Sequence, residues 1–420
     1  MAGKAAVFGL LSRGTFKIQG KVMAQLHLLS PAGFRASGVY AGIKTKQTPD
    51  IGLLIADRLS TAAAVFTTSK VISAAVKIGR KHIAGGKLRA VVVNSGNANA
   101  CTGRQGERDA MRMCTLAAQV AGCRAREILP SSTGIIGHPL PMEKVERGIV
   151  EAAQYLGRDR EQSLLFEDAI LTTDLKRKEA ATQFMVGRRR VKLAGICKGS
   201  GMIGPRMATM LAYLTTDAQI SAALLRKLMR EAADVSFNSV TVDDHASTND
   251  TACILASGLS EGRINTWGTT KSFGTALIEV CQSLAQQIAA DGEGATKMVT
   301  IIVQKAASDR DARLIARAIA ISPLVKCAMN GNDPNWGRIV SAAGLTAAKF
   351  DPNSAVLELQ GTPVFRKGRP LPFDPEKVGA ALRAKEVVVR LTCGLGKGEA
   401  KIWTCDLSKQ YVSINADYHT

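Results

Sequence analysis

A single threonine interrupts the apolar stretch at the centre of this chain, at Thr209. The apolar run covers 207–214 and follows a loop, 198–205, that contains three glycines and a proline. Such a loop can make sharp or left-handed turns. A buried hydroxyl costs free energy unless it finds a partner. Thr209 is therefore either an ordinary strand threonine bonded to a neighbouring carbonyl or a group that does chemistry.

The residues around Thr209 match a longer pattern. The segment 198–218 reads KGSGMIGPRMATMLAYLTTDA, and it resembles the central segment of the ornithine acetyltransferase family. The resemblance implies that the chain cuts itself between Ala208 and Thr209, that the freed Thr209 is the nucleophile, and that the mature enzyme consists of an α chain, 23–208, and a β chain, 209–420.

This chemistry is reasonable for a threonine at a strained bend. Attack of the Thr209 hydroxyl on the Ala208 carbonyl carbon would form an ester and break the peptide C–N bond, and water would then hydrolyse the ester. The liberated α-amino group would have a pKa of about 7.7 to 8.0, which suits a general base at neutral pH. One residue would then supply both nucleophile and base.

Two further strings match the family: NSGNANACTG at 94–103 and STG at 132–134. The first is rich in amide and small side chains, so it can approach a ligand closely. In the second, the resemblance implies that Thr133 and Gly134 form an oxyanion hole, which acyl transfer through a tetrahedral intermediate requires. From turn chemistry alone, STG would be a turn or a helix cap in a loop before the next helix.

Five residues are implied by the resemblance to bind substrate together with Thr209. An ordinary alternative stands beside each: a strand-end threonine, a solvated lysine, an exposed turn glutamate or a C-terminal tail that is merely packed. A carboxylate at a turn could pair with the ornithine ammonium, and a cation could hold a substrate carboxylate. The five residues are Thr172, Lys198, Glu293, Asn415 and Thr420.

The implied reaction is ping-pong transfer of an acetyl group from N2-acetyl-L-ornithine to L-glutamate, as in arginine biosynthesis. Some family members also use acetyl-CoA as donor, and no sequence feature decides that point here. No cofactor is expected. The implied fold has mixed α/β layers like those of the self-cleaving aminopeptidases, and the implied assembly is α2β2. The alternative is an amidase or aminopeptidase, in which water takes the acyl group from Thr209.

Several elements are expected to position these residues, from the spacing of apolar residues and from glycine and proline. The string 132–134 is expected in a loop before a helix. We predict separate short strands at 52–56 and 62–66, strands at 90–94 and 298–303, a hairpin over 183–196, and helices at 105–121, 142–156, 221–233 and 273–290.

Composition argues against several other classes of protein. The net charge of +20 attracts anions, and it leaves a basic nucleic-acid-binding protein as a remote alternative; aromatic residues make up only 5% and no recognition motif is present. No apolar run is long enough to span a membrane. Nine cysteines without CxxC spacing argue against a disulfide framework and against a zinc site. We therefore expect no metal. The cysteine pattern fits a protein of a reducing compartment.

The first residues form an extension of their own. The segment 1–22 is basic and contains no acidic residue, so it reads as a misassigned start ahead of Met23 or as a mitochondrial transit peptide. We predict a cytoplasmic enzyme, with the mitochondrial matrix as the alternative if 1–22 is a targeting segment.

Overall fold

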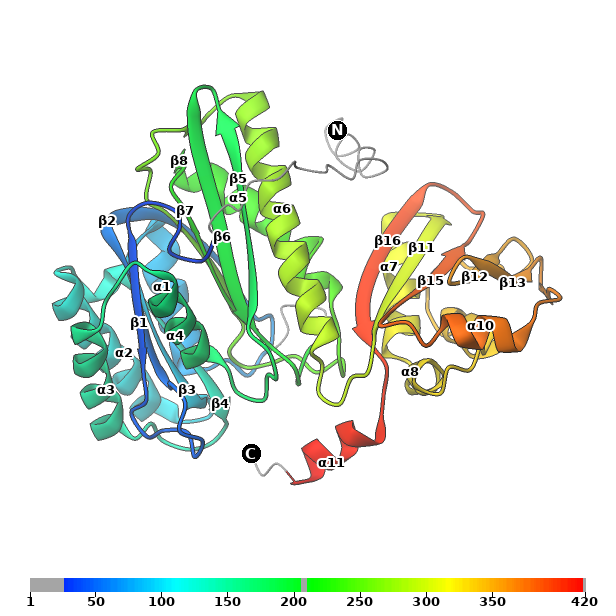
Figure 1. The fold of residues 1–420 in the computed structure, drawn as a ribbon, viewed down its shortest axis with the longest axis horizontal. Coiled ribbons are helices and arrows are strands. Elements are labelled where there is room, and N and C mark those ends of the chain that lie inside the picture. The colour runs from blue at the N-terminus through cyan, green and yellow to red at the C-terminus, as the bar shows by residue number, and fades with distance from the viewer. Residues whose placement is uncertain (1–25, 205–209, 418–420) are drawn as a thin grey trace.

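The computed structural model describes residues 26–204 and 210–417. The predicted extension 1–22, the predicted junction between Ala208 and Thr209, and Thr420 lie outside the described residues. Two bodies stand side by side: a first body, 26–290, and a second body, 298–405, with a short C-terminal helix below them (Figure 1).

The first body is built on an eight-stranded sheet. Its strands follow the order β4-β3-β2-β9-β7-β6-β5, with β1 also paired to β2. The strands are β1 (Phe34–Val39), β2 (Ile51–Phe66), β3 (Lys87–Asn97), β4 (Ile128–Ile135), β5 (Lys178–Val186), β6 (Arg189–Lys198), β7 (Leu211–Thr216) and β9 (Thr251–Ala256).

The sheet folds over on itself because β2 is long enough to serve both halves. The first half of β2 pairs with β1 and β3, and its second half pairs with β9. Successive side chains of a strand point to opposite faces. Thus Leu53 packs toward the outer helices, whereas Leu54 joins an inner core that also holds Tyr213 of β7. The two halves therefore face each other across that inner core.

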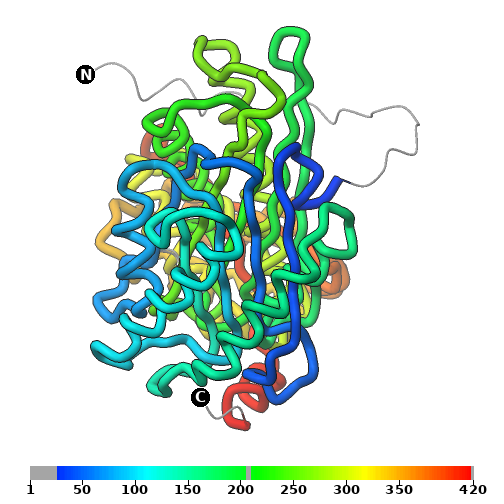
Figure 2. The backbone as a smooth tube through the Cα atoms, turned by 90° about the vertical axis from the view of Figure 1, so that its left-hand side faces the viewer, coloured from blue at the N-terminus to red at the C-terminus, as the bar shows by residue number. Residues whose placement is uncertain are grey.

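Helices cover the outer face of each half, which gives four layers in the order α, β, β, α. The β1–β4 half carries α1 (Ala74–His82), α2 (Gly103–Ala121) and α3 (Met142–Gln154). The β5–β9 half carries α5 (Ala222–Asp234) and α6 (Trp267–Ala290). Helix α4 (Arg160–Ile170) packs on β1 and contributes Phe166 to the inner core. Figure 2 views this body from the β1–β4 side, with blue and cyan segments in front.

The second body has its own core. Its six strands follow the order β14-β13-β12-β15-β11-β16, and the buried side chains of α7 to α10 pack with theirs. The strands are β11 (Met298–Ala306), β12 (Val356–Leu359), β13 (Thr362–Arg366), β14 (Arg369–Pro370), β15 (Glu386–Thr392) and β16 (Gly398–Cys405). The helices are α7 (Asp309–Ile321), α8 (Pro323–Asn330), α9 (Trp336–Gly344) and α10 (Pro375–Ala381).

Small elements complete the chain. Strands β8 (Gln219–Ile220) and β10 (Arg263–Ile264) pair with each other, and short 3-10 helices occupy η2 (Ile83–Gly85), η3 (Ala125–Glu127) and η4 (Phe237–Ser239). The terminal helix α11 (Lys409–Asp417) leaves the second body and lies below the first, in both Figure 1 and Figure 2.

Most predicted elements are confirmed. All four predicted helices form, and α2 ends as expected at Gly122, whose φ of 64° is left-handed. The hairpin of β5 and β6 turns at Gly187. Helix α6 begins earlier than predicted, because Thr266 and Thr269 form a capping box ahead of the apolar stripe.

Two predictions were wrong. The expected strands 52–56 and 62–66 are parts of the single strand β2, because residues 57–61 continue the backbone through a change of register. Thr133 and Gly134 lie in strand β4 rather than in a loop. They pair in parallel with β3, where Thr133 is opposite Ser95, and this pairing supplies backbone partners that local turn chemistry could not reveal.

No helix within 26–204 and 210–417 combines the length and apolarity needed to cross a bilayer. Over the same ranges, no group of three or more His, Cys, Asp or Glu side chains is arranged to hold a metal ion.

Candidate active site

The backbone on either side of the predicted junction is held by one segment, 241–251. On the upstream side, the Asp243 carboxylate accepts hydrogen bonds from the Met202 and Ile203 N–H groups, each at 2.7 Å. On the downstream side, the Met210 N–H donates to Asp250 Oδ1 at 3.0 Å. Burial raises the pKa of both carboxyls, and that of Asp250 rises well above its ordinary value. Asp243 and Asp250 thus hold the two flanks of the junction.

Lys198 ends strand β6 directly before the glycine-rich loop. It lies opposite Leu211 in the pairing of β6 with β7, which places it beside the strand that follows the junction. The side chain is buried, and Nζ lies 3.5 Å from Thr133 Oγ1. Burial lowers the pKa of Lys198, and the nearby Asp174 carboxylate partly offsets this effect. Two of the predicted site residues therefore meet.

Thr133 and Gly134 lie where β4 runs close against β3. Gly134 has a φ of 131°, and a Cβ there would lie 2.3 Å from the Gly96 carbonyl carbon, so only glycine fits. The Asn249 side-chain amide ties the two strands to the junction segment. Its Nδ2 donates to Ser132 O at 2.7 Å and to Ala98 O at 2.6 Å. The NSGNANA and STG strings thus lie side by side and are joined by Asn249.

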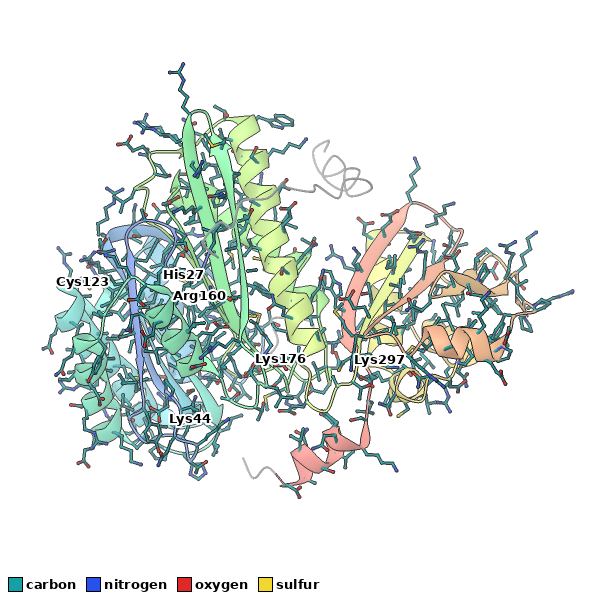
Figure 3. All side chains as sticks on the ribbon, viewed as in Figure 1. His27, Lys44, Cys123, Arg160, Lys176 and Lys297 are labelled. Atoms are coloured by element: carbon teal, nitrogen blue, oxygen red, sulfur yellow. The ribbon has the colours of Figure 1, made fainter. Side chains whose placement is uncertain are left out.

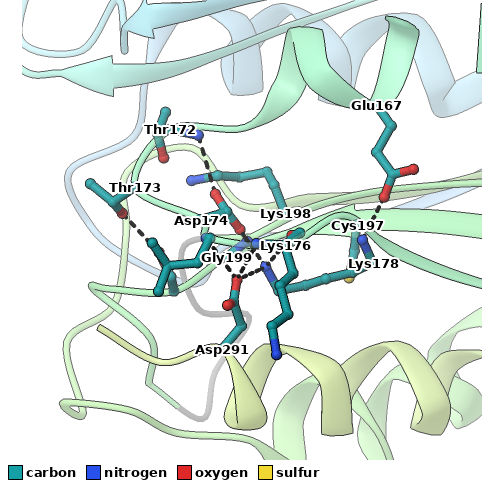
Figure 4. Close-up of polar contacts among 12 residues, drawn as sticks. Glu167, Thr172, Thr173, Asp174, Lys176, Lys178, Cys197, Lys198, Gly199 and Asp291 are labelled. Carbon is teal, nitrogen blue, oxygen red and sulfur yellow. Dashed lines mark hydrogen bonds and ion pairs between the residues drawn. The ribbon is translucent and has the colours of Figure 1, made fainter. Parts of the chain in front are cut away.

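Thr172 is held by a buried ion cluster that the sequence did not reveal (Figure 4). The Thr172 N–H donates to Asp174 Oδ2 at 3.1 Å, and the Gly199 N–H donates to Asp174 Oδ1 at 2.6 Å. Burial opposes ionisation of Asp174, but Lys178, Lys198 and these hydrogen bonds outweigh it and lower its pKa to about 2. Asp174 therefore stays charged and links Thr172 to the loop after Lys198.

Glu293 reaches the same loop from the end of α6. Its N–H donates to Ser200 O at 2.9 Å, and its carboxyl carbon would lie 2.3 Å from a Cβ at Gly201. Glu293 Oε2 accepts a hydrogen bond at 3.0 Å from Nδ2 of Asn415, in α11. The described members of the predicted set thus converge on the loop 198–201.

A second cation at this end of the first body, Lys44, was not predicted from the sequence. Lys44 is labelled there in Figure 3, and its Nζ donates to Pro49 O at 2.7 Å and to Asp168 O at 3.2 Å. Burial lowers its pKa to about 8, although Asp50 and Asp168 oppose the shift. Its sequence context, GIKTKQ, carries no pattern that distinguishes it from a solvated loop lysine.

One surface groove is separate from this site. A groove of about 910 Å3 is bordered by Arg58, Lys87, Gln219 and Arg263, among others, and by none of the described site residues. The candidate site is therefore identified by the residues that it brings together and not by this groove.

The family of the chain follows from comparison with known proteins. Residues 35–420 match the model of the ArgJ family. The arginine biosynthesis bifunctional protein ArgJ of Dehalococcoides mccartyi is 44% identical over 397 residues, which cover 94% of this chain and 97% of that protein. The protein of the same name from Symbiobacterium thermophilum is 45% identical over 395 residues, with 93% and 98% covered.

Solved structures are also similar. The structure of arginine biosynthesis bifunctional protein argJ from Bacillus halodurans shares 37% sequence identity and a TM-score of 0.47, and it covers 49% of this chain and 97% of that chain. The structure of ornithine acetyltransferase from Mycobacterium tuberculosis, complexed with ornithine, shares 32% identity and a TM-score of 0.40, with 44% and 95% covered.

Proposed function

The chain belongs to the ArgJ family and is an acyltransferase of arginine biosynthesis; from this we propose that it transfers an acetyl group from N2-acetyl-L-ornithine to L-glutamate through an acetyl ester on Thr209. One observation carries the proposal. The predicted residues Thr133 and Lys198 meet at 3.5 Å beside the strand that begins just after Thr209, and Glu293 reaches the same loop from another part of the chain.

The nucleophile arises by self-cleavage. The Thr209 hydroxyl attacks the Ala208 carbonyl carbon, the peptide nitrogen takes a proton and leaves as the α-amino group of Thr209, and water hydrolyses the resulting ester. The bonds from Asp243 to Met202 and Ile203 and from Asp250 to Met210 support this step, because they hold both flanks of the junction in place.

Acetyl transfer then proceeds in two halves. The α-amino group of Thr209 takes the hydroxyl proton as the hydroxyl attacks the acetyl carbonyl of acetylornithine, and that proton passes to the departing ornithine nitrogen. The Thr133 hydroxyl and the backbone N–H of Gly134 donate to the developing oxyanion. Glutamate then attacks the acetyl ester with its amino group and restores the free hydroxyl.

The remaining residues bind the substrates. Lys198 pairs with a substrate carboxylate, because its ammonium is held in the site with no competing carboxylate within 4.0 Å among the described residues. Glu293 pairs with the side-chain ammonium of ornithine, assisted by Asn415. Thr172 and Thr420 complete the pocket. Acetyl-CoA is a second candidate donor, and the cleaved chains assemble as α2β2.

Incubation with acetylornithine, with and without glutamate, tests the proposed reaction. Acetylglutamate should form only when glutamate is present, with little acetate in its absence. Release of acetate without acetylglutamate would instead favour the amidase, which shares the same nucleophile but passes the acetyl group to water.

A further inference from the structure

Lys178 lies at the centre of the ion cluster beside the candidate site. Its side chain is 1% exposed, and Nζ donates to Asp174 Oδ1 at 2.7 Å, to Asp291 Oδ2 at 2.5 Å and to Lys176 O at 3.2 Å. An ammonium group has three donors. All three Nζ donors of Lys178 are therefore bonded within the protein, and none remains for a substrate.

The two carboxylates held by Lys178 organise the backbone of the site. Asp174 accepts from the N–H groups of Thr172 and Gly199, as described above. Asp291 Oδ2 accepts from the N–H groups of Leu175 at 3.1 Å and Lys176 at 3.3 Å. Lys178 and Asp174 lie before the predicted junction and Asp291 lies after it, so the cluster joins the two predicted chains through buried contacts.

Lys198 is the second cation of this cluster and is bonded differently. Its side chain extends past Asp174 toward Thr172 (Figure 4), and Nζ donates a hydrogen bond to Thr133 Oγ1 at 3.5 Å. Among the residues that the structure describes, no carboxylate oxygen lies within 4.0 Å of Lys198 Nζ. Asp174 nevertheless favours the charged form of Lys198 and raises its pKa against the effect of burial. The two lysines therefore share one nearby carboxylate, and Lys178 holds it.

A buried ion cluster is seldom kept for stability alone, since apolar packing of similar volume is often as stable. Competition between the two lysines offers a functional reason. Without Lys178, Asp174 and Asp291 would be two buried anions. Lys198 is the other cation that lowers the pKa of Asp174, and Coulomb attraction in this weakly screened interior would draw it toward Asp174. Its ammonium would then be withdrawn from Thr133 and from the substrate.

We infer that Lys178 is a positioning residue: by binding both Asp174 and Asp291, it leaves the Lys198 ammonium free to bind the substrate carboxylate beside Thr133. The inference rests on the proposed function, because that function places substrate at Lys198. In this role Lys178 contacts no substrate, yet it controls the affinity of the enzyme for its substrate.

Steady-state kinetics of three variants test this role. Lys178→Met should raise KM for acetylornithine about tenfold or more, with a smaller fall in kcat, because ground-state binding is what is lost. Lys178→Arg, which keeps the charge and its donors, should restore KM to within about threefold. Lys326→Met is the matched control, since Lys326 is also buried but donates to Cys405 O and Thr404 Oγ1 in the second body. It should lower the melting temperature and leave KM unchanged.

Asp291→Asn separates positioning of Lys198 from simple bracing of the fold. With Asp291 neutral, Lys178 remains on Asp174, so KM should stay within about twofold of wild type even if the melting temperature falls. An increase in KM as large as that of Lys178→Met would overturn the inference, as would a Lys178→Met enzyme with wild-type KM. If Lys178→Met does not fold, Asp291→Asn and Lys178→Arg decide the question.

The test also separates this inference from the proposed function. Wild-type protein that turns over no acetylornithine would contradict the function. The same variants would then be compared by calorimetry with L-ornithine as the probe. Weaker binding to Lys178→Met alone would support the role of Lys178, and equal binding to all variants would refute it.

Discussion

Asn415 donates a hydrogen bond from Nδ2 to Glu293 Oε2 over 3.0 Å, although 122 residues separate the two in sequence. Helix α11 makes this contact possible, since it leaves the second body and returns below the first (Figure 1). Gly294, with a φ of 68°, lets the backbone at Tyr411 approach within a distance that any side chain would block. Helix α11 is therefore part of the candidate site.

Glu293→Gln should impair one substrate and spare the other. Acetylornithine carries a side-chain ammonium that Glu293 can pair with, whereas glutamate does not. We expect KM for acetylornithine to rise about tenfold or more, with KM for glutamate changed less than twofold. Ping-pong kinetics with both substrates varied would measure this. Glu261→Gln, at an exposed turn where Glu261 pairs with Arg189, is the control. Equal effects on both substrates would contradict the assignment.

Thr133→Ala should lower kcat by about 10² to 10³ with little change in KM, because an oxyanion donor acts mainly in the transition state. The matched control is Ser132→Ala, which removes the adjacent buried hydroxyl of the same strand. Single-turnover acetylation of the enzyme would confirm that the chemical step is affected. A Thr133→Ala enzyme with normal kcat would remove Thr133 from the oxyanion hole.

Asp250→Ala should slow self-cleavage, since it leaves the Met210 N–H buried without its partner at a cost of about 1 to 3 kcal/mol. Asp250→Asn keeps an acceptor oxygen at that position and should cleave at close to the wild-type rate. Time courses on denaturing gels after expression would compare the two. If the asparagine variant failed to cleave while folding normally, the charge or proton of Asp250 would be required instead.

Glu167 should make stability depend on pH. It is fully buried, and burial raises its pKa from 4.5 to about 8, although the Lys178 N–H bond opposes the shift. Between these values the native state binds more protons than the unfolded state, so the free energy of unfolding falls as pH rises from about 4.5 to 8.

Glu167→Gln cannot ionise and should remove that contribution. Thermal unfolding should show the variant more stable than wild type at pH 8, by on the order of a few kcal/mol, and much closer to it at pH 5. Glu399→Gln, at an exposed position, provides the control. A constant difference between variant and wild type across this range would contradict the buried-acid assignment.

The sequence predicted local elements better than long-range partners. The apolar stripe of α6 and the glycine at the end of α2 predicted those helices because both signals are local. The site strings were recognisable as a family pattern, and their described members converge. Nothing local could reveal that Lys178, in a sequence that reads as an ordinary strand, is paired with Asp291 on another element. Likewise, Thr133 lies in a strand only because β3 lies beside it.

The most direct test of the account is N-terminal sequencing of the purified protein after separation on a denaturing gel. We predict two fragments, 1–208 and 209–420 before any other processing, with the second beginning Thr-Met-Leu-Ala-Tyr. A Thr209→Ala protein should remain one inactive chain. A wild-type protein that stays uncleaved and still transfers acetyl groups at full rate would contradict the claim that Thr209 supplies both nucleophile and base.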